Sequence, residues 1–174
     1  MSPKLSVLVL LIVVSYLTIE IASKVEFTNI VCTSLDKEFS DFEYCYLKSV
    51  NRTYKYVSAK CNLYQTPVNF SLYKRFNGYR PFMYNITVDA CRFLKNPKSN
   101  PVTLFFFSSF ASFSNLNHSC PFSGALFVEK LSTEFINHQA TKVLPFPEGD
   151  YMIEFNWIAY DINRAVVKLY LTLS

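Results

Sequence analysis

Apolar and polar residues alternate in short runs along the chain. In the last run, Ala165, Val167, Leu169, Leu171 and Leu173 share one face, and the residues between them share the other. A period of two residues is typical of a β-strand with one buried face. The same pattern, in runs rich in Tyr, Phe, Val and Thr, predicts strands at residues 25–33, 42–50, 54–64, 68–76, 81–94, 125–131, 151–160 and 165–173.

Short turns separate these predicted strands. Asn77-Gly78 is the strongest hairpin signal, and Asn51-Arg52 lies between two earlier runs. About eight strands without a regular alternation of strands and helices predict a mainly β fold, an antiparallel β-sandwich.

One aromatic segment has helical periodicity instead. Asn100 can cap a helix and Pro101 can begin one, and Phe106, Phe110 and Phe113 then follow at i, i+4 and i+7 spacing. Other apolar residues cover most of the remaining circumference, so this helix must be largely covered. A short helix over residues 101–113 is therefore predicted to pack over one edge or mouth of the sandwich.

The chain begins with the features of a secretory signal peptide. Lys4 precedes an apolar run from Leu5 to Leu17, and the small pair Ala22-Ser23 offers a cleavage site. This run is shorter than the roughly 20 residues that span a bilayer. We therefore expect residues 1–23 to be removed and residues 24–174 to form a single secreted, extracellular domain.

Asn-x-Ser/Thr sequons agree with an extracellular location. Asn69 and Asn85 each alternate with apolar neighbours, which places them on the outer face of their strands. The predicted glycosylation sites, which should all be exposed, are Asn51, Asn69, Asn85 and Asn117.

Five cysteines occur in the chain, and most should be oxidised in the secretory pathway. Spacing alone does not decide among the many possible pairings. We expect Cys32 to pair with Cys45, because antiparallel pairing of their two strands would bring them together. We expect Cys91 to pair with Cys120, which lies in a dense turn. Cys61 shares a face with apolar residues and is predicted to be a buried free thiol, with an intermolecular disulfide as the alternative.

The sequence lacks a recognisable catalytic constellation. His118 and His138 are the only two histidines, and there is no Gly-x-Ser-x-Gly turn. A metal site built from these histidines and a cysteine would compete with disulfide formation. The net charge is +4, and the basic residues are scattered. We therefore expect no enzyme activity, no metal, no cofactor and no nucleic-acid partner.

Aromatic residues are unusually frequent, with 17 Phe, 12 Tyr and one Trp. Aromatic side chains fill the cores of sandwiches, but two sheets can also separate and leave an apolar cavity that accepts an acyl chain or another hydrophobe. The residues predicted to point inward and line such a cavity are Phe70, Leu72, Phe82, Ile86, Phe106, Phe110, Phe127, Phe155 and Trp157.

Four blocks in order carry a family resemblance: KRFNGYRPF at residues 74–82, NITVDAC at 85–91, NLNHSCPF at 115–122 and PFPEGDY at 145–151. They resemble a large insect family of small secreted proteins, classed as a domain of unknown function and related to the CheB chemosensory proteins of flies. The resemblance implies an immunoglobulin-like sandwich similar to the ML lipid-recognition domains, which hold a lipid between their sheets. It also implies a gustatory accessory role beside a sodium channel, so that a membrane receptor or channel would be a partner. Cys61 departs from the family pattern, in agreement with a free thiol.

Two hypotheses for the function follow. The first is a secreted, non-enzymatic protein that binds a hydrophobic small molecule or lipid between its sheets, in pheromone or taste sensing. The alternative is a secreted glycoprotein with a filled core that acts through its surface on another protein. An internal pocket smaller than about 300 Å³ would favour this alternative. The sequence predicts neither the ligand's identity nor an oligomeric state.

Overall fold

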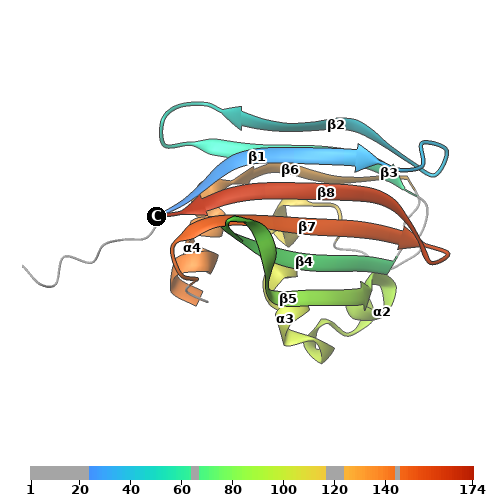
Figure 1. The fold of residues 1–174 in the computed structure, drawn as a ribbon. Coiled ribbons are helices and arrows are strands. Elements are labelled where there is room, and N and C mark those ends of the chain that lie inside the picture. The colour runs from blue at the N-terminus through green and yellow to red at the C-terminus, as the bar shows by residue number, and fades with distance from the viewer. Residues whose placement is uncertain (1–23, 64–66, 117–123, 144–145) are drawn as a thin grey trace, which may run out of the picture.

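The computed structural model describes residues 24–63, 67–116, 124–143 and 146–174, most of which form two antiparallel β-sheets. The larger sheet has the order β1-β8-β7-β4-β5, and the smaller has the order β2-β3-β6 (Figure 1). The predicted signal peptide, Asn117 and Cys120 lie outside the described residues. The strands are β1 (Val25–Ser34), β2 (Ser40–Ser49), β3 (Lys55–Leu63), β4 (Pro67–Phe76), β5 (Gly78–Asp89), β6 (Ala125–Ser132), β7 (Gly149–Ala159) and β8 (Ile162–Leu173).

The mainly β, antiparallel character predicted from the alternation is confirmed, and each predicted strand corresponds to one of these strands. The predicted hairpin at Asn77-Gly78 joins β4 to β5, and Gly78 adopts a φ of 103° that favours glycine. The strand predicted over residues 81–94 was wrong at its C-terminal end, because β5 stops at Asp89 and helix α2 (Ala90–Lys95) follows. The Asp89 side chain accepts a hydrogen bond from the Arg92 N–H at 2.9 Å, so it caps a helix instead of continuing a strand.

Helix α3 (Pro101–Ser108) begins as predicted but ends early. The Asn100 side chain accepts from the Thr103 N–H at 3.0 Å, and Pro101 occupies the first turn. At the other end, the Ser108 and Ser109 hydroxyls both donate to the Phe105 carbonyl, which competes with helix propagation. The rest of the predicted helix is the short 3₁₀ segment η2 (Ala111–Phe113).

Three further helical segments were not predicted: η1 (Pro97–Ser99), α4 (Thr133–His138) and the π-helical turn η3 (Gln139–Val143). The Ser132 hydroxyl accepts from the Phe135 N–H at 3.4 Å and caps α4. Helix α4 is fixed against β1, because the Val25 N–H donates to the Asn137 side-chain oxygen at 2.7 Å. None of the helices in the described ranges is long and apolar enough to cross a membrane.

Buried side chains from both sheets form one main core, so the sheets pack face to face. Phe27 of β1 and Val57 of β3, for example, belong to the same cluster. The Cys32–Cys45 disulfide links β1 to β2 and therefore ties the two sheets together. This disulfide was predicted, but the reason given for it was wrong. The strands that carry Cys32 and Cys45 do not pair with each other, since β1 pairs with β8 and β2 pairs with β3.

The other cysteines are distributed as follows. Cys61 is free and buried. Cys91 is disulfide-bonded, and Cys120, its predicted partner, is not among the described residues.

Candidate ligand-binding cavity

An apolar cavity of about 270 Å³ lies between the two sheets. Side chains from all eight described strands and from α2, α3 and α4 contribute to its lining. Alternation along the strands explains this lining, because Val68, Phe70 and Leu72 on β4 face the cavity while the residues between them do not. On β8, every second residue from Val167 to Leu173 lines the cavity in the same way.

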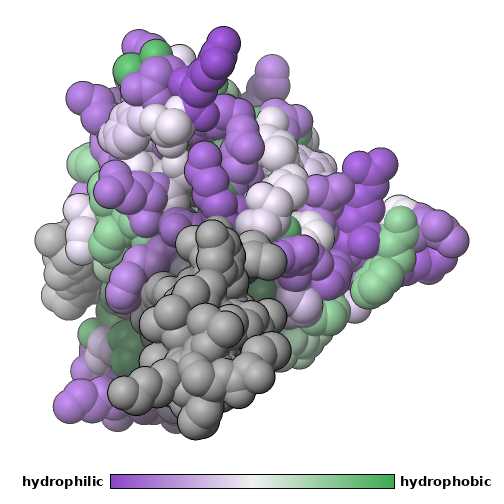
Figure 2. Space-filling model, turned by 90° about the vertical axis from the view of Figure 1, so that its left-hand side faces the viewer, coloured by the Kyte–Doolittle hydropathy of each residue, from purple (hydrophilic) through white to green (hydrophobic). Residues whose placement is uncertain are grey.

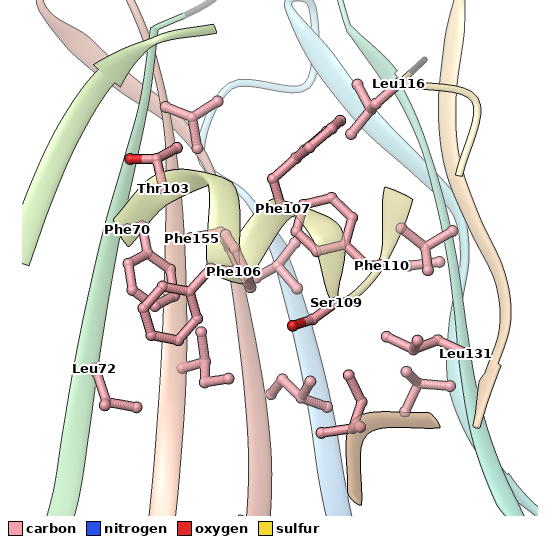
Figure 3. A pocket seen from close by; sticks show the side chains of 18 of the residues that line it. Phe70, Leu72, Thr103, Phe106, Phe107, Ser109, Phe110, Leu116, Leu131 and Phe155 are labelled. Atoms are coloured by element: carbon pink, nitrogen blue, oxygen red, sulfur yellow. The ribbon is translucent and has the colours of Figure 1, made fainter. Parts of the chain in front are cut away.

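Helix α3 forms one wall of the cavity with its aromatic side chains. Figure 3 shows Phe106 of α3 beside Phe70, and the ring of Phe110, which follows the helix, lies 6.1 Å from that of Phe155, centre to centre. The ring of Phe106 lies 4.1 Å from that of Phe70, centre to centre, and Phe70 lies 5.5 Å from Phe155. These tilted ring contacts are a favourable arrangement for aromatic side chains, and they hold the helix against the larger sheet.

Seven of the nine residues predicted to line a cavity lie in its lining. They are Phe70, Leu72, Phe106, Phe110, Phe127, Phe155 and Trp157.

Phe82 and Ile86 do not line the cavity, so their prediction was wrong. Both lie on β5, which is the edge strand of the larger sheet. The register of β5 against β4 also shifts between Ser71 and Tyr73, and Phe82 packs on Tyr151 with ring centres 5.9 Å apart. Val88, near the end of the same strand, does line the cavity, so among the described residues of β5 the lining is confined to that position.

The sequence interpretation missed the lining residues of the two short helices. Phe93 of α2 is 5% exposed and Ile136 belongs to α4, and both line the cavity. The signals that could have located these helices are the capping residues Asp89 and Ser132.

The lining contains no Asp, Glu, Lys, Arg or His among the residues that the structure describes. Its polar members include Thr103, Ser109 and Gln139, and the Ser109 hydroxyl is engaged by the Phe105 carbonyl at 3.1 Å. Burial raises the pKa of the Cys61 thiol to about 12, with a smaller contribution from the charge of Asp41. The cavity therefore offers an uncharged, low-polarity environment.

Residues 68–153 match a family described as a protein of unknown function, DUF1091. The match includes all four blocks on which the resemblance was based, so that the resemblance to an uncharacterised family is confirmed for this segment. No curated protein matches the chain. The DUF1091 segment supplies β4, β5, α2, α3 and β6 to the cavity wall, while β1, β2, β3 and β8 lie outside the match and complete the lining.

Asn69 and Asn85, two of the predicted glycosylation sites within the DUF1091 segment, contact each other on the outer face of the larger sheet. The Asn69 amide donates to the Asn85 side-chain oxygen at 3.0 Å and to the Thr87 hydroxyl at 2.9 Å. Asn85 is exposed, whereas Asn69 is half-buried in this network. Asn51 is exposed in the turn between β2 and β3, where its side-chain oxygen accepts from the Thr53 N–H at 2.9 Å.

The outer surface contrasts with the cavity. Figure 2 views the end of the molecule that lies on the left of Figure 1, and hydrophilic side chains cover most of what can be seen, with smaller hydrophobic areas between them.

Replacing Cys61 with alanine should change how stability depends on pH. Because burial holds the folded pKa at about 12, an unfolded chain loses the thiol proton at lower pH than the folded protein, and stability falls as pH rises above about 9. Between pH 7 and pH 10 the free energy of unfolding should fall by about 1.4 kcal/mol more in the wild type than in Cys61→Ala.

Urea denaturation of both proteins at the two pH values measures this difference. The pKa of Tyr44 is also raised to about 12, by its hydrogen bond to Glu129. Both proteins contain Tyr44, so its effect on the pH dependence of stability cancels in the comparison. Equal losses of stability would contradict the prediction.

Proposed function

We propose that this chain is a non-enzymatic carrier or co-receptor that holds a hydrophobic small molecule or lipid between its two sheets. The observation that supports this proposal is the cavity, whose described lining is uncharged and comes from both sheets and the helices. Binding would be driven by removal of apolar ligand surface from water, at about 25 cal/mol per Å².

The volume of the cavity alone does not separate this proposal from the filled-core alternative. About 270 Å³ is slightly below the roughly 300 Å³ at which small-molecule pockets usually begin, and that comparison favours the alternative. The cavity is nevertheless larger than an apolar cavity of about 150 Å³, which is large enough to bind benzene.

The shape of the lining favours a carrier of elongated ligands. Along β7 the lining runs from Tyr151 through Ile153 and Phe155 to Trp157, which corresponds to roughly 20 Å at about 3.3 Å per residue. An apolar space of this length suits a chain-like guest better than a compact one.

The proposed setting is extracellular chemosensation, in which a membrane receptor or channel would receive or sense the loaded protein. Support for this setting comes from the resemblance of the four sequence blocks to a family related to the CheB proteins, a resemblance that implies a sandwich similar to the ML domains. The Cys32–Cys45 disulfide adds support, because stable disulfides are typical of secreted proteins.

Filling the cavity tests the proposal. Ser109 lines the cavity, and Figure 3 shows its hydroxyl directed into the space between Phe106 and Phe110. A phenylalanine at this position should occupy the space of the ligand. Ser109→Phe should therefore bind N-phenyl-1-naphthylamine, a neutral fluorescent hydrophobe, at least about tenfold more weakly than the wild type.

The neighbouring Ser108 provides a matched control. Its hydroxyl donates to the same Phe105 carbonyl, but the side chain is exposed. Ser108→Phe should bind the probe as the wild type does. If the wild-type protein binds no probe, and a native mass spectrum of secreted material contains no retained molecule, the surface-acting alternative replaces the carrier.

A further inference from the structure

A buried hydrogen-bond donor at one end of the cavity has no partner within the part of the chain that the structure describes. Trp157 lines the cavity, and its indole Nε1–H is buried without a hydrogen-bond partner among the described residues. A buried N–H group is nearly always paired in native proteins, because leaving it unpaired is costly. An acceptor supplied by a ligand would satisfy this donor.

Charges around this end of the cavity disfavour an anionic acceptor. Trp157 packs in a cluster with Cys61 and Leu126, and the negative charge of Asp41 acts on the Cys61 thiol and raises its pKa. A carboxylate brought to Trp157 would thus face a like charge as well as the cost of burial.

Neither Arg164 nor Lys74, two described cations near the lining, is placed to compensate for such a carboxylate. Arg164 lies over the ring of Phe39, a member of the same cluster, but its guanidinium is already paired with Asp36. Lys74 lies over the ring of Tyr151, 5.3 Å from its centre. Tyr151 is six residues from Trp157 on β7, so Lys74 lies at the opposite end, roughly 20 Å away.

The geometry points to an uncharged ligand with a hydrogen-bond acceptor, such as an ester, ketone or aldehyde oxygen, placed against Trp157 Nε1 while its apolar chain extends along β7 toward Tyr151. This inference rests on the proposed carrier function and specifies its ligand class. Free fatty acids in their ionised form are the class that the site rejects.

Three probes of equal size test the selectivity by displacement of N-phenyl-1-naphthylamine from the full secreted protein. Methyl heptanoate and octanoic acid are isomers, and butylbenzene has the same number of non-hydrogen atoms but lacks an oxygen acceptor. At about pH 8, where octanoic acid is ionised, the ester should bind at least about tenfold more tightly than the acid. At about pH 4 the carboxyl group of octanoic acid is largely protonated, so the affinity of the acid should approach that of the ester. The affinity of the ester itself should be the same at both pH values.

The role of Trp157 is tested by Trp157→Phe, which removes the N–H and keeps an aromatic ring. The ratio of ester to butylbenzene affinity should fall about fivefold in this variant, the usual effect of one hydrogen bond. NMR spectroscopy of the wild-type protein provides a second test that needs no variant, because Trp157 is the only tryptophan of the chain. Its single indole N–H resonance should shift downfield when methyl heptanoate is added to the wild type, and much less with butylbenzene.

The possible outcomes separate this inference from the proposed function. If no probe displaces the fluorescent hydrophobe and none of them shifts the indole resonance, the carrier function itself is wrong. If the ionised acid binds as tightly as the ester, or if the indole resonance responds equally to ester and butylbenzene, the carrier function survives and the ligand class inferred here is overturned.

Discussion

Phe27→Ala should lower the free energy of unfolding by about 4 kcal/mol, among the largest losses expected from a single substitution in this chain. Phe27 is 0% exposed and packs in the main core, and it does not line the cavity. Its ring is therefore surrounded by protein atoms, and removal costs both the burial of the ring and the contacts of its neighbours. Urea denaturation at pH 7 measures the loss.

Phe70→Ala is the matched comparison. Phe70 is 8% exposed, belongs to the same core and lines the cavity. Because one side of its ring already faces open space, fewer contacts are lost, and we expect a cost of about 3 kcal/mol. A larger loss for Phe70→Ala than for Phe27→Ala would contradict the placement of the cavity.

Removing the disulfide between the sheets is the second change with a large expected effect. The double variant Cys32→Ala and Cys45→Ala should be less stable by about 3 kcal/mol, because the bond closes a loop with a sequence separation of 13 residues. Urea denaturation of the double variant measures this loss. Substitution is preferable to chemical reduction, since Cys91 is also disulfide-bonded.

The control for this experiment is Cys61→Ala, which removes a sulfur atom that forms no disulfide. Cys61 is 5% exposed, so its removal should cost about 1 kcal/mol from lost packing alone. Equal losses for the double variant and for Cys61→Ala would show that the cross-link contributes nothing beyond packing.

Strands were predictable from the sequence because alternation reports directly which side chains are buried. The run from Ala165 to Leu173 identified the inward face of β8, and Val68, Phe70 and Leu72 did the same for β4. The local signals at Asn77-Gly78 and at Asn100-Pro101 also correctly located a hairpin and a helix start, since both act through backbone geometry a few residues away.

The errors arose where long-range arrangement decides the outcome. Alternation gives the inward face of a strand but not how far along it a cavity extends, so Phe82 and Ile86 were assigned to the lining, although Val88 is the described residue of β5 that reaches it. Nor does it reveal which sheet contains each strand, so the correct Cys32–Cys45 pairing was expected for an incorrect reason. The short helices α2 and α4 were missed because their apolar residues are too few to establish a helical period.

Every described strand contributes to the lining of the cavity, so the side chains that would select a guest are also those that hold the protein together. A guest would act as an additional piece of the hydrophobic core, and its binding energy would add to the resistance of the protein to unfolding. Empty molecules would then be the first to open and be degraded by proteases. Changes in guest preference would in turn require compensating substitutions elsewhere in the same interior.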